Sequence, residues 1–361
     1  MKQSLIILFI FLFIVFFYLN IYSIRLSNSI QDYDSSSIEL DVVYTWVDGN
    51  DLHWKDKKNK YTPNDFTIQK ENSNQRYQNI QELKYSIRSI YYNMPWIHHI
   101  YIVVDDDQIP SFINLSHPKI TIVPHSTIFP SNEYLPTFNS HSIESCLHRI
   151  PNLKKYFMYM NDDFFIGRPI YPSHLFHNNL PYFFLQHVSI QNKLDKLSWN
   201  KNYHQVAYEN TNRFLNSILS NRKYNRQWHL PVVLNRDICY LLEYKYPYVF
   251  HTNRKYKFRH KKQYHIIALI NLYMVELGYK IPCPELPNKI VQFNNTTFTN
   301  EYITNTFHSF FTKQIAIRSL KQILYDKPYF YCLNDVPTQY KEHVIDFFNS
   351  MYPYPCEFEV S

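Results

Sequence analysis

The segment from residue 40 to residue 160 alternates between short apolar runs and runs with helical spacing, and this order limits the folds open to the chain. Leu40 to Val47, Ile100 to Val104 and Tyr156 to Met160 have the length and composition of buried strands, and Lys119 to Val123 is a fourth. Between them, Ile80 to Tyr92 carries apolar residues at helical spacing. Strands that alternate with helices predict an α/β domain.

Three later segments are predicted to be helices. Ser140 to Arg149 has Ser140 as its expected N-cap, Ile266 to Val275 is strongly apolar, and Tyr340 to Met351 is amphipathic. The chain of 361 residues is long enough for one large α/β domain or two small ones. Because no Pro/Gly/Ser-rich linker interrupts it, residues 38–361 are predicted to act as one unit.

Three of the predicted strands end in acidic residues, at Asp48-Gly49, at Asp105-Asp106-Asp107 and at Asn161-Asp162-Asp163. One such ending is ordinary turn chemistry, but three on alternating elements indicate an acidic rim. Ligands of parallel α/β sheets bind beyond the carboxyl ends of the strands, where carboxylates can hold a divalent cation against a diphosphate. The D-x-D spacing of residues 105–107 and the acidic pair at 162–163 are rival metal sites.

The small number of glycines excludes several classes of nucleotide-binding protein. The chain has only three glycines, Gly49, Gly167 and Gly278, so it cannot contain a Walker loop, a GxGxxG turn or a GxSxG nucleophile elbow. Any nucleotide must be held by side chains, a metal ion or helix ends. The net charge of +7 suits an anionic substrate, and without a long basic run no nucleic-acid partner is predicted.

The N-terminus contains an uncharged stretch, Leu5 to Ile24, between Lys2 and Arg25. Twenty residues of helix span about 30 Å, the thickness of a bilayer core, which predicts a single transmembrane signal anchor; a cleaved signal peptide is the alternative. Residues 1–4 would then form a cytoplasmic tail and residues 25–37 a luminal stem. The expected location is a Golgi or other secretory-pathway membrane, single-pass type II, with the catalytic domain luminal. The sequons at Asn114 and at Asn294-Asn295 agree with that route.

The five cysteines show no C-x-x-C spacing, which disfavours a zinc ribbon or a thioredoxin motif. The sequence allows one or two disulfides, with Cys332 and Cys356 as a plausible local pair. In the helix expected after Ser140, a step of 100° per residue places His141, Glu144 and His148 within about 60° of one another. That face is either an ordinary solvated surface or, given two His and one Glu, a source of a base or a metal ligand.

Four blocks, in order along the chain, carry a family resemblance. They are Asp41 to Gly49 (DVVYTWVDG); Arg76 to Asp163, opening with RYQNIQELKYSIRSIYYNMPWIHHIYIV; His229-Leu-Pro231 with Asp237 and Arg259-His260; and Cys332-Leu-Asn-Asp335 with Phe347 to Phe358. Together they resemble the Stealth family, which includes bacterial capsule polymerases and the catalytic subunit of lysosomal-enzyme N-acetylglucosamine-1-phosphotransferase.

The resemblance implies a nucleotide-sugar-binding, Rossmann-like (GT-A-like) mixed sheet flanked by helices. It also implies an enzyme that transfers a hexose-1-phosphate, such as N-acetylglucosamine-1-phosphate from UDP-GlcNAc, to a glycan or glycoprotein hydroxyl. The nucleoside monophosphate is released, and Mg²⁺ or Mn²⁺ is the expected cofactor. Two alternatives stay open: a metal-dependent glycosyltransferase that moves the sugar alone, and a catalytically inactive glycan-binding homologue.

Carried over position by position, the resemblance gives a set of site residues. The catalytic candidates are Asp48, Glu144, Asp163, His229 and Arg259; the substrate-binding candidates are Arg76, Gln108, His148 and Asp237; the metal ligands are Asp162 and Asp163. Arg259 would pair with phosphate oxygens, and Glu144 or His229 would take the acceptor proton. Asp48 would orient the metal or the sugar. The chain departs from the family at Lys261-Lys262-Gln263, where relatives commonly carry an acid.

Overall fold

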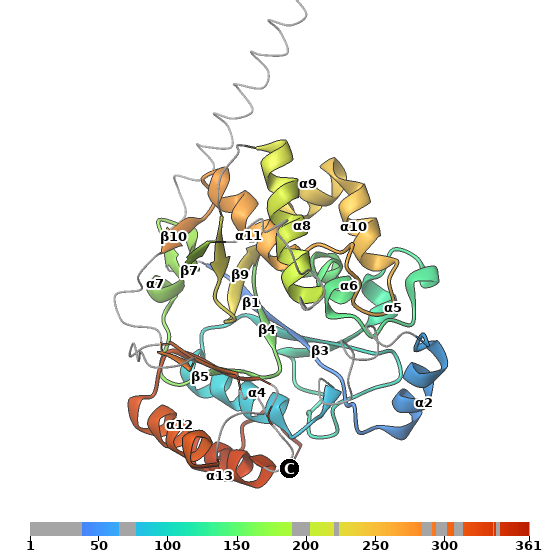
Figure 1. The fold of residues 1–361 in the computed structure, drawn as a ribbon. Coiled ribbons are helices and arrows are strands. Elements are labelled where there is room, and N and C mark those ends of the chain that lie inside the picture. Colours follow the sequence, from blue (N-terminus) through green and yellow to red (C-terminus); the bar gives the residue numbers. More distant parts are fainter. Residues whose placement is uncertain are drawn as a thin grey trace, which may run out of the picture.

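The computed structural model describes residues 38–64, 77–189, 203–219, 224–283, 291–293, 302–306, 313–334, 336 and 340–360. Its centre is a five-stranded sheet in the order β3-β2-β1-β4-β9 (Figure 1). The strands are β1 (Leu40–Thr45), β2 (His99–Val104), β3 (Ile120–Pro124), β4 (Tyr156–Asn161) and β9 (Val232–Asn235). The first four are parallel to their neighbours, and β9 is antiparallel to β4.

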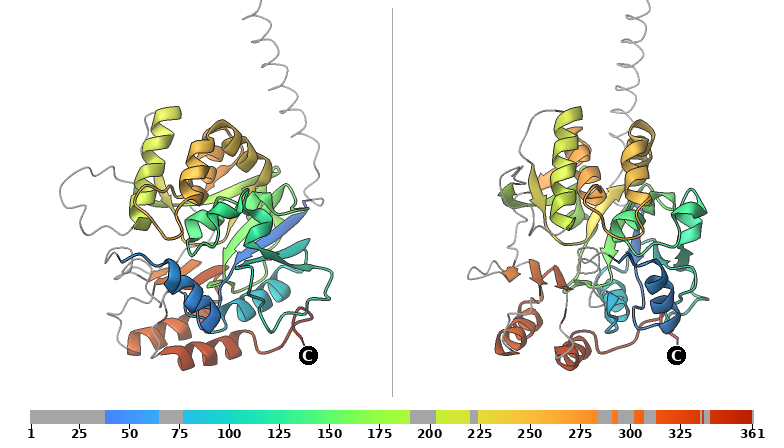
Figure 2. Two further views of the ribbon diagram at one scale, coloured as in Figure 1. Left: turned by 90° about the vertical axis from the view of Figure 1, so that its right-hand side faces the viewer. Right: turned by 45° about the vertical axis from the view of Figure 1, so that its right-hand side comes forward.

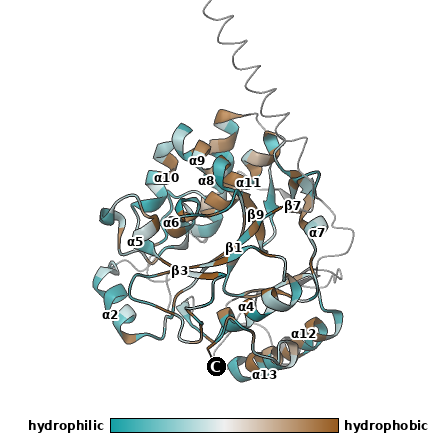
Figure 3. Ribbon diagram, turned by 180° about the vertical axis from the view of Figure 1, so that it is seen from behind, coloured by the Kyte–Doolittle hydropathy of each residue, from teal (hydrophilic) through white to brown (hydrophobic). Residues whose placement is uncertain are grey.

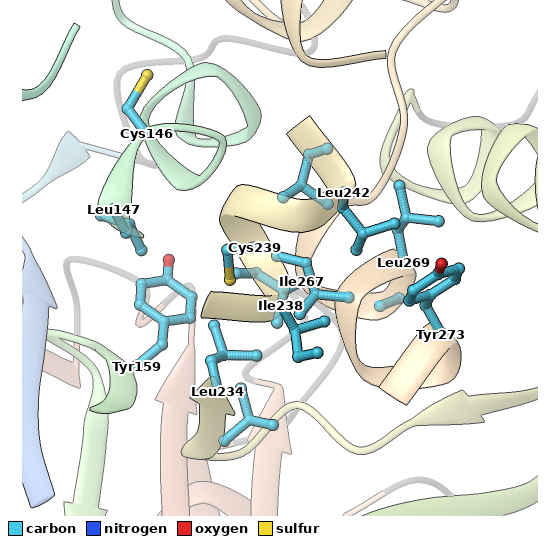
Figure 4. Close-up of a cluster of buried hydrophobic side chains, with 14 of the residues drawn as sticks. Cys146, Leu147, Tyr159, Leu234, Ile238, Cys239, Leu242, Ile267, Leu269 and Tyr273 are labelled. Atoms are coloured by element: carbon cyan, nitrogen blue, oxygen red, sulfur yellow. The ribbon is translucent and has the colours of Figure 1, made fainter. Parts of the chain in front are cut away.

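Both faces of this sheet are buried, as expected for a parallel sheet. Along β1, Val43 packs into one apolar cluster, whereas Val42 and Tyr44 pack into another. Figure 4 shows part of the first cluster, where Leu234 of β9 and Ile238 of the following helix lie close together. The alternation of side chains along a strand therefore places an apolar layer on each side of the sheet.

The remaining elements cover the central sheet and extend it into smaller ones. The helices are α2 (Leu52–Tyr61), α4 (Glu82–Asn93), α5 (His125–Ile128), η3 (Asn132–Tyr134), α6 (Ser140–Glu144), η4 (Leu147–Arg149), α7 (Pro172–Leu175), α8 (Tyr203–Ile218), α9 (Arg236–Lys245), α10 (Pro247–Arg254), α11 (Ile266–Glu276), α12 (Lys313–Asp326) and α13 (Lys341–Met351). The other strands are β5 (Phe164–Ile166), β6 (Phe176–His177), β7 (Leu180–Ser189), β8 (Asn225–Gln227), β10 (Ile281–Cys283), β11 (Val291–Phe293), β12 (Tyr302–Thr306) and β13 (Phe330–Asn334).

Two groups of helices flank the sheet on opposite sides (Figures 1 and 2). Helices α8 to α11 lie on one side, and α4, α12 and α13 lie on the other. Helix α11 is buried from Ile266 to Met274. Helices α12 and α13 show hydrophobic and hydrophilic residues side by side, as amphipathic helices do (Figure 3). The predicted α/β mixed sheet flanked by helices is therefore confirmed.

The predicted helix from Ser140 to Arg149 is interrupted after Glu144. Its N-cap is Asn139 rather than Ser140, because the Asn139 side chain accepts a hydrogen bond from the His141 backbone N–H. The Ser145 carbonyl accepts from the Arg254 guanidinium at 2.6 Å, and the chain continues as the short 3₁₀ turn η4. A side chain from α10 thus takes a carbonyl that a longer helix would have used.

The Cys332–Cys356 disulfide, which the sequence allows as a local pair, does not form in the structure. Within the described part of the chain, both residues are buried thiols that form no disulfide, as are Cys146 and Cys239. The reason at Cys332 is local, because its sulfur lies near polar atoms of Asp163 and His229 instead of a second sulfur.

The single transmembrane helix of the predicted fold class is not supported. Within the described ranges, which begin at residue 38, the structure contains no helix with the length and apolar character needed to cross a membrane. The stretch from Leu5 to Ile24, with the tail and stem on either side of it, lies outside those ranges.

The turn after β1 depends on a close backbone contact. A Cβ added at Gly49 would lie 1.8 Å from the Tyr77 carbonyl oxygen, so no other residue fits there without moving one of the two segments. Gly49 therefore keeps residue 77 against the end of β1.

Candidate active site

A cavity of about 490 Å³ opens at the carboxyl ends of the central strands, a size typical of small-molecule sites. Thr45, Trp46 and Val47 line it after β1, Asp105 after β2, and Asn161 to Asp163 at the end of β4. The chain order of the strands reverses between β1 and β4, which is the point where α/β sheets bind ligands. The cavity thus lies at the end of the sheet where the sequence predicts the site.

Five of the predicted site residues line this one cavity: Glu144, Asp162, Asp163, His229 and Arg259. They come from α6, the loop after β4, the segment between β8 and β9, and the loop after α10. These segments are far apart along the chain, so only the folded sheet brings the five side chains together.

Glu144 is a carboxyl group in an apolar setting. Burial raises its pKa to about 7, although the charge of Arg259 and a hydrogen bond from Tyr159 act in the opposite direction. The Tyr159 hydroxyl donates to Glu144 Oε1 at 3.4 Å, whereas Oε2 is buried and has no hydrogen-bond partner within the described structure. Near neutral pH this group can both accept and donate a proton.

Arg259 lines the cavity from the loop between α10 and α11. Its Nη2 donates to the Ser140 hydroxyl at 3.0 Å, which links the guanidinium to the helix that carries Glu144. A guanidinium that lines the cavity suits the oxygens of a phosphate, because its planar fork matches their geometry.

His229 and Asp163 meet near a thiol. One ligand atom each of Asp163, His229 and Cys332 lies within 4.8 Å of the other two, a spacing that could hold a metal ion. Burial lowers the pKa of His229 to about 4, with a further contribution from the charge of Arg259, so the imidazole is neutral at pH 7. A neutral imidazole can act as a metal ligand.

Glu82 is a cavity residue that the sequence interpretation missed. It begins α4, is buried, and accepts a hydrogen bond from the Ile80 backbone N–H at 2.7 Å. Burial and the nearby charge of Asp162 raise its pKa to about 8, and burial raises the pKa of Asp162 to about 6. Acids crowded in this way fit a divalent cation, because a cation would remove the cost of ionising them. An acid in the first turn of a helix is common for other reasons, so no sequence signal marks Glu82.

The rival metal site at Asp105-Asp106-Asp107 already contains a cationic side chain. Lys57 Nζ donates to Asp105 Oδ1 at 2.6 Å and to Asp107 Oδ2 at 2.7 Å. Burial acts to lower the pKa of Lys57, but the hydrogen bonds to Asp105 and Asp107 outweigh it and raise the pKa. The ammonium group thus takes the position that a metal ion would need, and the acids at 162–163 are the better metal site.

Two predicted residues brace the loop after β1 rather than line the cavity. Asp48 accepts from the Asn50 N–H through its carboxylate and donates its backbone N–H to the Gln108 side-chain oxygen. The buried Gln108 amide in turn donates to the Asp48 carbonyl and to Asp51. Their contacts fix the turn that precedes α2.

Two other predicted residues also lie away from the cavity lining. His148 is buried, and its Nε2 lies 2.6 Å from Glu243 of α9. Because the helix breaks after Glu144, residue 148 does not share a helix face with His141 and Glu144 as expected. Asp237 is exposed at the start of α9, where it pairs with Arg236. Arg76 lies outside the described residues.

Gln263, where the family resemblance led us to expect an acid, is a fully buried amide. Its Oε1 accepts from the His260 backbone N–H, and its Nε2 donates to the Asn253 carbonyl at 2.8 Å. The Asn253 side-chain oxygen accepts a hydrogen bond from the Tyr264 backbone N–H. The Gln263 and Asn253 amides therefore brace both ends of the loop that carries Arg259. The residue is therefore a structural part of the loop, and the change from acid to amide leaves no gap in it.

Comparison with known proteins matches the N-terminal half of the domain to two family models. Residues 39–65 match Stealth protein CR1, conserved region 1, and residues 76–183 match Stealth protein CR2, conserved region 2. The exopolysaccharide phosphotransferase SCO6023 of Streptomyces coelicolor is 47% identical over 141 residues, which are 39% of this chain and 23% of that protein. The capsular polysaccharide phosphotransferase LcbA of Neisseria meningitidis is 40% identical over 166 residues, 45% of this chain and 44% of that protein. The chain thus spans less than half the length of either relative.

Among solved structures, the galactosyltransferase LgtC with donor and acceptor sugar analogues is 11% identical and covers 67% of this chain and 72% of its own, with a TM-score of 0.32. A structure of an active-site mutant of LgtC is 9% identical, covers 86% and 95%, and has a TM-score of 0.36. TM-scores this low do not establish a shared fold, so the GT-A-like part of the predicted fold class stays a prediction.

The predicted Golgi or secretory-pathway membrane location is contradicted. The described part of the chain contains no helix able to cross a membrane, and both relatives come from bacteria, which have no Golgi apparatus. The two conserved regions follow each other in order and supply β1, β2 and β4 with the acids at their ends. Residues 39–183 of the chain therefore contain conserved regions 1 and 2 of the Stealth proteins.

Proposed function

We propose that the protein is a sugar-1-phosphate transferase, which moves a hexose-1-phosphate from a nucleotide diphosphate sugar to a glycan hydroxyl and releases the nucleoside monophosphate. The observation that carries the proposal is the meeting of Glu144, Asp162, Asp163, His229 and Arg259 in one cavity at the sheet's switch point. The names of the two bacterial relatives, both polysaccharide phosphotransferases, support the reaction class.

The reaction breaks one P–O bond and forms another at the phosphorus next to the sugar. The acceptor oxygen attacks this phosphorus, and the oxygen that joins it to the nucleoside monophosphate leaves with the bonding electron pair. Negative charge gathers on the phosphate oxygens in the transition state, so stabilising that charge is the main catalytic task. Arg259 is assigned to these oxygens, because its planar fork can contact two of them at once.

Glu144 is assigned as the base that takes the acceptor proton. Its Oε2 is buried without a hydrogen-bond partner in the described structure, and its pKa of about 7 makes the carboxylate available at neutral pH. The Tyr159 hydroxyl contacts the other oxygen, Oε1, at 3.4 Å. Between Glu144 and His229, Glu144 is the stronger candidate, because His229 belongs to the group with metal-ligand spacing.

A divalent cation, Mg²⁺ or Mn²⁺, is assigned to Asp162 and Asp163, with His229 beside them. Carboxylate ligands suit both ions, whereas the Cys332 thiol suits neither. When bound, the cation neutralises the charge of the diphosphate and of the leaving nucleoside monophosphate. Asp162 and Asp163 lie between β4 and β5, where both line the cavity.

The test is to incubate the full chain with a panel of nucleotide-sugars, a polysaccharide acceptor and Mg²⁺ or Mn²⁺, and to identify the released nucleotide. We expect nucleoside monophosphate with the sugar phosphate joined to the acceptor. Release of nucleoside diphosphate would instead show a glycosyltransferase that moves the sugar alone. No turnover and no binding of any nucleotide-sugar would contradict the proposal and leave a glycan-binding homologue.

A further inference from the structure

The cavity lining also includes two residues with buried side-chain oxygens that lack partners among the described residues. Asp105 Oδ2 and Thr137 Oγ1 both line the cavity, and neither has a hydrogen-bond partner among the described residues. Asp105 is 4% exposed and Thr137 is 2% exposed. A buried polar atom without a partner is costly, so such atoms in a cavity point to a ligand that supplies the missing hydrogen bonds.

Asp105 is fixed in one orientation by Lys57, which donates to Oδ1 at 2.6 Å. The Lys57 ammonium also contacts Asp107, whose side chain is 54% exposed. Asp107 does not line the cavity, so it can serve as a control for Asp105. With Oδ1 used in this way, Oδ2 is left as a buried acceptor on a residue of the cavity lining. An ionised carboxylate can only accept hydrogen bonds, so the ligand group opposite must be an O–H or N–H.

An aromatic wall adjoins the two oxygens. Trp54 lies three residues before Lys57 on α2 and contacts Phe138, the neighbour of Thr137, with ring centroids 5.5 Å apart. The Tyr77 ring lies 5.0 Å from Trp54, and all three rings line the cavity. Flat rings beside fixed acceptors suit a nucleoside, which presents an aromatic base and a ribose with hydroxyl groups.

The position of Asp105 in the sheet favours the ribose over the base. Asp105 directly follows β2, the neighbour of β1 in the order β3-β2-β1-β4. In nucleotide-binding sheets of this order, an acid at the end of the second strand hydrogen-bonds a ribose hydroxyl while the phosphates lie toward the switch point. In the present cavity the switch point is the end that holds Asp162 and Asp163.

We propose that Asp105 is a ribose-binding residue, whose Oδ2 accepts a hydrogen bond from a ribose hydroxyl of the nucleotide. This inference rests on the proposed function, because it places the nucleoside of the donor at Asp105 and its diphosphate at Arg259 and the acids. It also gives the protein a means to prefer ribonucleotides over deoxyribonucleotides.

The test is isothermal titration calorimetry of the full chain with nucleoside diphosphates of each base, followed by the 2′-deoxy and 3′-deoxy forms of the tightest binder. The wild-type protein should bind the ribonucleotide about tenfold or more tightly than at least one deoxy form, as a hydrogen bond to a charged group predicts. Asp105→Asn should abolish this preference, because its amide oxygen will pair with Lys57 and its NH₂ group cannot accept. Asp107→Asn, which removes the same charge and the other Lys57 contact, should keep it.

The outcomes separate this inference from the proposed function. Binding without a ribose preference in the wild type, or a preference that survives Asp105→Asn, overturns the inference alone. Loss of the preference in both Asn variants also overturns it, because the cause would then be the charge near Lys57. If circular dichroism shows that Asp105→Asn does not fold, Asp105→Ala, which removes the carboxylate, takes its place, and an unchanged preference in that variant overturns the inference. Failure of every nucleoside diphosphate to bind overturns both proposals.

Discussion

Glu144 allows a prediction in which stability and activity change in opposite directions. In the unfolded chain its carboxyl titrates near its ordinary pKa of 4.5, whereas burial raises its pKa in the folded protein to about 7. The folded state therefore holds an extra proton between these values, and stability must fall as the pH rises through that window. Below pH 4.5 the carboxyl is protonated in both the folded and the unfolded state, so its burial no longer lowers the free energy of unfolding through ionisation.

The size of the effect follows from the difference between the two pKa values. A difference of about 2.5 units corresponds to about 3 kcal/mol at 1.36 kcal/mol per unit. Glu144→Gln removes the titration but keeps the size of the side chain and an oxygen that can accept from Tyr159. The free energy of unfolding of Glu144→Gln, minus that of the wild type, should therefore rise by about 3 kcal/mol between pH 4.5 and pH 8. The rise, rather than its value at any single pH, is the prediction, because the new NH₂ group contributes an offset that does not depend on pH.

The measurement is urea unfolding of both proteins in metal-free buffer at steps of half a pH unit. Titrations of other acids, Glu82 and Asp162 included, occur in both proteins and cancel in the difference. Glu342→Gln, on the exposed side of α13, is the matched control and should give a flat difference. A flat curve for Glu144→Gln, or an equal rise in the control, would refute the reasoning. The same variant should lose turnover by about 10²- to 10⁴-fold, as expected for removal of a general base.

Three further predictions concern the cavity and its supporting loop. Arg259→Lys should lower kcat by about 10²-fold or more while the exposed Arg318→Lys changes nothing, and equal effects would exclude a two-oxygen phosphate contact at Arg259. Asp163→Asn should abolish turnover and weaken binding of Mn²⁺ measured by calorimetry, and unchanged Mn²⁺ affinity would remove Asp163 from the metal site. Gln263→Glu loses the donor to the Asn253 carbonyl, so it should destabilise the protein by about 1–3 kcal/mol and raise KM; a neutral or stabilising result in thermal unfolding would contradict its bracing role.

The sequence predicted those parts of the fold whose signal is local. The apolar runs of β1, β2 and β4 and the acids after them were visible because strand length and turn residues are properties of a few neighbouring positions. The rotation of His148 away from the cavity was not, because it follows from a hydrogen bond between Ser145 and Arg254, which are 109 positions apart. The sequence pattern of α6 contains nothing that indicates this contact.

The site divides in the same way. Residues in the recognisable blocks, such as Glu144 and Arg259, were predicted, and the structure brings them to one cavity. Lys57 and Glu82 were missed because their importance depends on residues from other segments. The Lys57 ammonium pairs with Asp105, and the Glu82 carboxyl lies near the charge of Asp162. Charge pairing across the sheet cannot be inferred before the strand order is known, and β9, which closes the sheet beside β4, gave no strong sequence signal of its own.

The contact between Gly49 and the Tyr77 backbone restricts how this protein can be engineered. Because the obstacle is a main-chain carbonyl, no change of the Tyr77 side chain could make room for a larger residue at position 49. A library intended to change nucleotide preference should therefore vary the ring at position 77 and hold position 49 constant. Replacing Gly49 would instead displace the Tyr77 backbone and, with it, the ring that contacts Trp54.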